Sequence, residues 1–208
     1  MTEQGRNLMI EKEFSPGIER TFAMIKPDGV QRGLIGEIIA RFEKRGLKVV
    51  ALKMVKPSIE HIDEHYPKDD KWIARLGNKG FTVFDEQGIS RMEAMGTEDE
   101  LEAGKQVRGW LVDYLVSAPV VPMVIEGVQA IEMVRKIVGS TLPSKADIGT
   151  IRGDFSTDSP IAANLTKRPI RNLVHCSETQ EEAEHEIAHW FSADEVYEYE
   201  RSDHTAMF

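Results

Sequence analysis

Cysteine and long apolar runs are nearly absent from this sequence. One cysteine, Cys176, stands among 208 residues, which excludes an internal disulfide framework and fits a reducing cytoplasm. No stretch reaches the roughly 20 apolar residues that a membrane-spanning helix requires. Residues 1–19 mix charges and lack the apolar core of a signal peptide. We therefore expect a cytoplasmic protein that makes no membrane contact.

Positive charge is in short supply as well. The chain has 26 lysine and arginine residues against 35 aspartate and glutamate residues, a formal net charge of −9. This balance argues against general nucleic-acid binding, although local basic residues can still hold the phosphates of a nucleotide. The length suffices for one domain with a sizeable core. We expect residues 1–18 to form a partly disordered N-terminal extension and residues 19–208 to form that domain.

The most informative stretch of the chain is NLVHCSET at residues 172–179. A short apolar strand leads to His175, and a helix start follows, with Ser177 and Gln180 in the spacing of a capping box. A helix N-terminus attracts phosphate, and a neutral imidazole beside it is a candidate phosphoryl acceptor. A lone histidine at a strand end is more often structural, so this assignment depends on other segments.

Two other segments point to the same chemistry. Residues 21–29 predict a strand that ends in Lys26 and a tight Pro-Asp-Gly turn, and residues 149–155 place Arg152 between glycines. Together with the NLVHCS run, they closely resemble the nucleoside diphosphate kinase family, over about residues 19–191. The resemblance implies transfer of a γ-phosphate from nucleoside triphosphates to nucleoside diphosphates, in two half-reactions through phosphohistidine and with broad base specificity.

The same resemblance implies a role for each of ten residues. His175 would carry the phosphoryl group, Glu186 would orient its imidazole, and Ser177 would support that carboxylate. Lys26 would contact the transferring phosphate, and Tyr66 would hydrogen-bond near it. The nucleotide would also be held by Arg135 and Arg152 at the remaining phosphates, Thr141 as a hydroxyl donor to them, Asn172 at the sugar, and Val107 at the base, where family members usually have a stacking phenylalanine.

The resemblance further implies a cofactor and partners. Mg²⁺ would arrive with the nucleotide, bound mainly by phosphates and water and by no protein residue directly, although Glu178 could assist through water. The partners would be nucleoside di- and triphosphates and other copies of this chain. Family members assemble as trimers of dimers or as tetramers, so we expect a homohexamer. The loop after Gly139 and the tail after Phe191 are the expected contact segments.

The apolar periodicity predicts an α/β (α+β) protein. Strands are expected at residues 20–25, 47–55, 120–125 and 172–176, and helices at residues 34–45, 58–66, 107–116, 128–138 and 179–191. This βαββαβ order predicts a ferredoxin-like sandwich with an antiparallel sheet, the fold that the resemblance also implies. Pro122 favours an edge strand or a missing ladder hydrogen bond.

Two connections are longer than the family core requires. Residues 67–106 predict an inserted lobe, in which the apolar patch at residues 81–84 suggests a hairpin, and residues 156–171 form a lengthened connection. The lobe contributes three aromatic residues, Trp72, Phe81 and Phe84. One of them would cover the base across from Val107, or all of them would fill the core of the lobe.

A competing motif lies at residues 185–189, where HEIAH matches the H-E-x-x-H signature of zinc proteases. The apolar residues of this helix gather on one face, which directs His185 and His189 toward water rather than into a cleft. Glu186 would lie at the border of the buried face, within reach of His175. A non-catalytic nucleotide-binding scaffold is a further alternative.

A Cys–His dyad is the last alternative. Adjacent residues on a strand point to opposite faces, so Cys176 cannot easily meet His175. We expect a buried and inert thiol.

Overall fold

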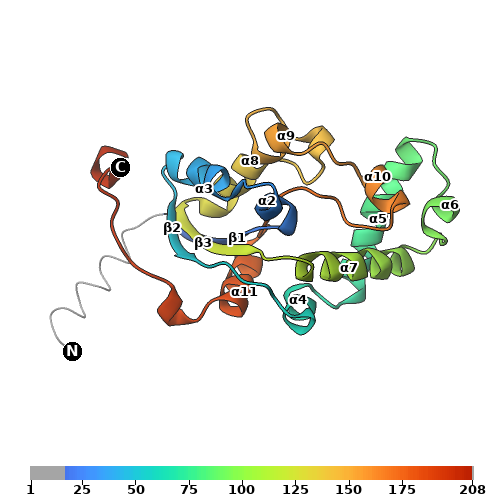
Figure 1. The fold of residues 1–208 in the computed structure, drawn as a ribbon, viewed down its shortest axis with the longest axis horizontal. Coiled ribbons are helices and arrows are strands. Elements are labelled where there is room, and N and C mark those ends of the chain that lie inside the picture. Colours follow the sequence, from blue (N-terminus) through green and yellow to red (C-terminus); the bar gives the residue numbers. More distant parts are fainter. Residues whose placement is uncertain (1–16, 208) are drawn as a thin grey trace.

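The computed structural model describes residues 17–207, which are built around one four-stranded antiparallel sheet (Figure 1). Its strands are β1 (Ile18–Ile25), β2 (Lys48–Leu52), β3 (Val121–Val128) and β4 (Val174–Cys176). Their spatial order, β2-β3-β1-β4, confirms the predicted ferredoxin-like fold. The extension predicted at residues 1–18 lies almost entirely outside the described residues.

Helices cover both faces of the sheet and form a lobe at one end (Figure 1). On one face lie α3 (Ile35–Lys44) and α8 (Ala130–Val138), and on the other α4 (Ile59–His65), α7 (Glu100–Val116) and α11 (Gln180–Trp190). The lobe contains α5 (Asp70–Glu86) and α6 (Arg91–Met95), and α10 (Pro160–Leu165) packs against both. The shorter helices are α2 (Pro27–Gln31), η1 (Pro143–Lys145), α9 (Ile151–Phe155), η2 (Ala193–Glu195) and α12 (His204–Met207). Within residues 17–207, no helix is long and apolar enough to cross a membrane.

The central strand β1 is buried on both faces, which explains its nearly continuous apolar sequence. Phe22 and Met24 are fully buried in the layer that contains α4, α7 and α11. Ala23 and Ile25 alternate with them and are fully buried against α3 and α8. Burial of each large apolar side chain contributes about 1.5–3 kcal/mol, so β1 anchors both layers and holds its carboxyl end in place.

Pro122 lies in a central strand, so the expectation of an edge strand is wrong. β3 is flanked by β1 and β2, and Pro122 is the register partner of Met24. Proline has no N–H to donate, so the other part of the expectation, a missing ladder bond, holds. The Pro122 carbonyl still accepts the N–H of Lys53 at 3.2 Å, one residue beyond the end of β2.

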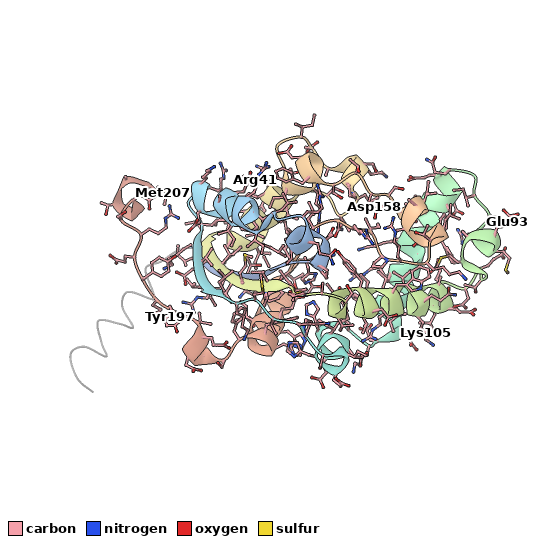
Figure 2. The ribbon with its side chains drawn as sticks, in the orientation of Figure 1. Arg41, Glu93, Lys105, Asp158, Tyr197 and Met207 are labelled. Atoms are coloured by element: carbon pink, nitrogen blue, oxygen red, sulfur yellow. The ribbon has the colours of Figure 1, made fainter. Side chains whose placement is uncertain are left out.

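The lobe at residues 67–106 is helical, so the hairpin expected at residues 81–84 is wrong. Residues 81–84 lie inside α5, where Phe81 and Phe84 are fully buried against Met95 and Ala103. Phe81 and Phe84 are three residues apart, so they fall on the same side of a helix, whereas in a strand they would face opposite ways. The lobe, marked by Glu93 of α6, lies at one end of the molecule, and Met207 lies at the other (Figure 2).

Two glycines set the contact between α5 and α7. A Cβ atom on Gly77 would lie 2.1 Å from the carbonyl oxygen of Glu100, and one on Gly104 would lie 1.9 Å from that of Ile73. Side chains larger than hydrogen therefore do not fit at this crossing without a shift of the backbone. The close approach fixes how α5 is rotated about its own axis.

Candidate active site

A hydrogen-bonded chain orients the imidazole at the end of β4. His175 Nε2 lies 2.6 Å from Glu186 Oε1, and the hydroxyl of Ser177 donates to Glu186 Oε2 at 2.6 Å. A carboxylate only accepts, so Nε2 carries the hydrogen and Nδ1 keeps its lone pair. Burial raises the pKa of Glu186, but its interactions with His175, His65 and the hydroxyl of Ser177 lower it to about 2.

The backbone before β4 is strained, and buried polar groups hold it. Leu173 has a φ of +70°, a left-handed conformation that costs about 1–3 kcal/mol for a residue with a side chain. The N–H of Lys26 donates to the Leu173 carbonyl at 2.8 Å, and the Leu173 N–H donates to Asp28 Oδ2 at 3.1 Å. The hydroxyl of Tyr114 donates to Asp28 Oδ1 at 2.6 Å. Asp28 and Tyr114 therefore position the strand that carries His175.

Lys26 is a buried cation beside this strand. Its ammonium donates to Asn172 Oδ1 at 2.8 Å, and the amide of Asn172 donates to the carbonyl of Thr141 at 2.9 Å. Burial and then the nearby charge of Arg152 lower the pKa of Lys26 to about 8. Asn172 thus ties Lys26 to the loop that follows α8, although sequence reasoning expected it at the sugar.

Two arginines approach the same region in different ways. Arg152 is buried and donates to the carbonyls of Asn172 at 3.1 Å and Gly139 at 2.8 Å, and also to that of Val174. A guanidinium has five N–H donors, so Arg152 holds the loop against β4 and keeps donors for a ligand. Arg135 is exposed and pairs with Glu178 at 3.2 Å.

His65 is a site residue that sequence reasoning missed. It is 2% exposed, and its Nδ1 accepts the indole N–H of Trp190 at 3.3 Å. Burial and then the imidazole of His175 lower the pKa of His65 to about 3, so the ring is neutral with its hydrogen on Nε2. That atom lies 3.8 Å from Glu186 Oε1. A lone histidine before Tyr66 carries no motif that would single it out.

Tyr66 and Cys176 also line the pocket around His175. The ring of Tyr66 is buried, 6.5 Å from that of His175 between centroids, and burial raises the pKa of its hydroxyl. Cys176 is half-buried and also lines the pocket, so it is more exposed than the buried thiol that the sequence predicted. Burial raises the pKa of the Cys176 thiol, which therefore stays protonated at neutral pH.

These groups line a pocket of about 720 Å³. Of the residues singled out in the sequence, the lining includes Lys26, Tyr66, Arg135, Thr141, Arg152, Asn172, His175, Glu178 and Glu186, with Trp72 from the lobe. Ser177 lies behind Glu186. The structure does not bring Val107 to the lining: it packs with Phe81 and Phe84 in the lobe, and Leu111, one turn along α7, lines the pocket instead.

Two local expectations for α11 need correction. Thr179, and not Ser177, caps the helix, because its hydroxyl accepts the N–H of Glu182 at 3.2 Å. His189 is half-buried rather than turned fully to water: its ring stacks on His61 with centroids 4.0 Å apart, and its Nε2 lies 2.8 Å from the His61 carbonyl oxygen. His185 is exposed, as expected, but it also lines the pocket, which the sequence did not predict.

The geometry does not support a zinc protease site. Glu186 is engaged by His175 and Ser177. Among the described residues, one group of three could hold a metal by proximity, namely His65, His175 and Glu186. His65 cannot ligate through Nε2, since that atom carries the hydrogen. The HEIAH match at residues 185–189 is therefore coincidental.

Comparison with known proteins identifies the family of this chain. The sequence profile of the family described as Nucleoside diphosphate kinase matches residues 19–72 and 70–196. The chain belongs to the nucleoside diphosphate kinase family. A nucleoside diphosphate kinase of Pyrobaculum aerophilum is 49% identical over 181 residues, which cover 87% of this chain and 99% of that protein. The corresponding protein of Archaeoglobus fulgidus is 40% identical over 89% of this chain and 95% of its own length.

Solved structures extend the family likeness to the fold. The crystal structure of the Pyrobaculum aerophilum NDP kinase matches with a TM-score of 0.84 and 48% identity, and covers 87% of this chain and 100% of that one. The nucleoside-diphosphate kinase of Borrelia burgdorferi, solved as a transition state mimic with bound vanadate and ADP, matches with a TM-score of 0.75 and 34% identity. That match covers 92% of this chain and 98% of the other.

Proposed function

We propose that this chain transfers the γ-phosphate of a nucleoside triphosphate to a nucleoside diphosphate, by way of a phosphohistidine at His175. The observation that carries the proposal is the state of that imidazole. Its Nε2 is engaged by the carboxylate of Glu186, whereas Nδ1 has no hydrogen-bond partner in the described part of the chain. The ring lines a pocket that also contains Lys26, Arg135 and Arg152. A placed nucleophile among cations is what phosphoryl transfer requires.

In the first half-reaction, the lone pair of His175 Nδ1 attacks the γ-phosphorus. The N–P bond forms while the bond from phosphorus to the β–γ bridging oxygen breaks, and the nucleoside diphosphate leaves with that electron pair. Phosphorylation at Nδ1 leaves the ring cationic, with its hydrogen still on Nε2. The carboxylate of Glu186, 2.6 Å from Nε2, stabilises this charge and fixes the ring plane. A second nucleoside diphosphate reverses these steps.

The phosphates need positive charge on several sides. Lys26 is protonated over most of the physiological range, because its lowered pKa of about 8 still lies above 7. Together with Arg135 and Arg152 it would neutralise charge that spreads over the transferring group. Thr141 lies on the same loop as Gly139, whose carbonyl accepts a hydrogen bond from Arg152. The hydroxyl of Thr141 would donate to the remaining phosphates.

Mg²⁺ fits this pocket as a companion of the nucleotide. The ion prefers oxygen ligands, and the pocket wall offers the carboxylates of Glu178 and Glu182, whereas the His65–His175–Glu186 group is rich in nitrogen. Glu178 is the residue that would hold the ion, through water. When bound, Mg²⁺ supplies neutralisation of phosphate charge. The residues of the chain orient the nucleophile and the phosphate tail.

The compartment, oligomeric state and base specificity of the enzyme are a separate part of the proposal. We propose that it acts in the cytoplasm as a homohexamer with broad base specificity. The single cysteine supports a reducing compartment.

Incubation with γ-labelled ATP tests the function. The wild-type chain should acquire a label that is lost in acid and kept in base, and ADP should discharge it. His175→Ala should acquire none, whereas His185→Ala, which removes another histidine of the pocket lining, should be labelled as the wild type. A wild-type chain that binds ATP without label would be the non-catalytic scaffold instead.

A further inference from the structure

The helix α5 presents one face to the pocket. The α5 residues in the lining are Trp72, Arg75, Lys79, Thr82, Val83 and Glu86. Their spacings of three and four residues, with one neighbouring pair, trace a single stripe along an α-helix. Residues spread along the length of α5 therefore form one wall of the pocket, and this helix belongs to the lobe predicted at residues 67–106.

This stripe cannot turn away from the pocket. On another side of α5, Gly77 lies against Glu100 of α7, and Ile73 lies against Gly104, with no room for a Cβ at either glycine. Phe84 is also fully buried there. Rotation of α5 would bring side chains into this contact and expose the aromatic core of the lobe. The position of the stripe is a consequence of helix packing.

Two cations on the stripe have no partner of their own. Neither Arg75 nor Lys79 makes an ion pair or a hydrogen bond within the described part of the chain. In contrast, Arg135 in the same lining pairs with Glu178 at 3.2 Å, and Lys145 lies 3.6 Å from Glu86. Cations that face a pocket without a carboxylate partner are available to an anionic ligand.

The two cations share the pocket lining with Arg135, Arg152 and His175, the residues proposed to contact the phosphates. Burial raises the pKa of Glu178, and its hydrogen bond with Arg135 lowers it. The charges of Lys79 and then Arg75 also lower it, although neither residue forms an ion pair with this carboxylate. Glu178 is three residues beyond His175, on the segment that leads into α11. Ammonium and guanidinium groups have only donors, which suits phosphate oxygens.

We propose that Arg75 and Lys79 bind the phosphate tail of the nucleotide, as a cation pair that the lobe adds across the pocket from Arg135. This assignment rests on the proposed function, because the triphosphate is the ligand that places negative charge there. It gives the lobe a direct part in substrate binding. Lys71, Arg75 and Lys79 are all exposed residues of α5, but Lys71 does not line the pocket, so a solvated helix face is the interpretation for Lys71 alone.

Equilibrium binding of ATP, ADP and AMP tests the proposal. The measurement uses the full chain with His175→Ala, so that no phosphate is transferred. Adding Arg75→Ala and Lys79→Ala should weaken ATP by about tenfold or more and ADP by less, with AMP within about twofold. Arg75→Gln with Lys79→Gln, which keeps side-chain length, should show the same loss. Lys71→Ala removes one charge from α5 outside the pocket and should change none of the three.

Each result decides the matter. An ATP dissociation constant within about twofold of the parent, with an unchanged thermal unfolding midpoint, would overturn the proposal. An equal loss for AMP would overturn it too, because the cations would then contact the base or sugar. The proposed function fails separately, if the wild-type chain forms no phosphohistidine, since the binding series does not depend on transfer.

Discussion

Glu186 is a carboxylate that stays ionised although it is only 6% exposed. A buried carboxylate normally becomes neutral, but both oxygens here accept hydrogen bonds, from His175 and Ser177. With a pKa of about 2, it remains an anion throughout the pH range in which an imidazole can act as a nucleophile. The negative charge therefore persists before and after phosphorylation of the ring.

Glu186→Gln tests this role, because it replaces one carboxylate oxygen by an amide nitrogen and changes little else. The amide keeps the shape of the side chain but lacks the charge that stabilises a cationic ring. We expect kcat to fall about 10- to 100-fold with KM for ATP within about threefold, the pattern of a group needed mainly in the transition state. Steady-state kinetics measure it, with the exposed Glu184→Gln on the same helix as control. An unchanged kcat would refute the role.

Loss of the Lys26 proton should weaken nucleotide binding at alkaline pH. Burial and Arg152 lower the pKa of Lys26 from 10.5 to about 8, so the free ammonium loses its proton as the pH rises through about 8. A bound phosphate favours the charged form and raises the pKa again. We expect ATP affinity to fall above pH 8 and binding near pH 9 to take up a proton. Calorimetry in buffers of different ionisation enthalpy measures the uptake, which should vanish in Lys26→Gln.

Some of the residues predicted from sequence lie within short motifs, and the others were expected from the family resemblance alone. His175, Lys26 and Arg152 stand in runs whose residue types already suggest phosphate chemistry, and the structure brings them to one pocket. His65 and Asp28 were missed, because their importance depends on partners 125 and 86 residues away, the indole of Trp190 and the hydroxyl of Tyr114. No local pattern reports such contacts.

At the scale of elements, the four strands and the helices that cover the sheet were predicted to within a few residues. The exception is α7, which begins at Glu100 and not at the predicted residue 107. The failure came in the lobe, where the run Phe-Thr-Val-Phe at residues 81–84 has local strand propensity. Helix packing overrides that propensity, because Phe81 and Phe84 find a shared core with Ala103 of α7. The same misjudged packing explains Val107: the rotation of α7 against α5 turns Leu111 to the pocket.

The α5–α7 crossing predicts opposite effects for two glycines of one helix. A Cβ at Gly104 would lie 1.9 Å from the Ile73 carbonyl, so Gly104→Ala should lower the free energy of unfolding by about 1–3 kcal/mol. A Cβ at Gly109 would meet nothing within 4 Å, so Gly109→Ala should raise it by about 0.5–1 kcal/mol through helix propensity. Urea unfolding measures both. A stabilised Gly104→Ala would show that the helices are not in close contact.

The whole molecule is assembled so that distant segments meet at one pocket. The carboxyl end of β1, the end of α4, the loop after α8, and β4 with the start of α11 supply the nucleophile and its surroundings, and α5 closes one side. The lobe extends the molecule to one end, and the C-terminal tail with Tyr197 and Met207 lies at the other (Figure 2). The surfaces that remain for self-association include the loop after Gly139.

That loop carries Ile148, which at 94% is the most exposed large apolar side chain of residues 17–207. A hexamer that uses the loop would bury it, and a carboxylate there would be desolvated without a partner. We expect light scattering to give a hexamer mass for the wild type and a smaller species for Ile148→Asp. Met92→Asp, at a half-exposed position of α6 outside both expected contact segments, should keep the hexamer mass. A wild-type monomer at micromolar concentration would reject the hexamer, and an intact Ile148→Asp hexamer would place its contacts elsewhere.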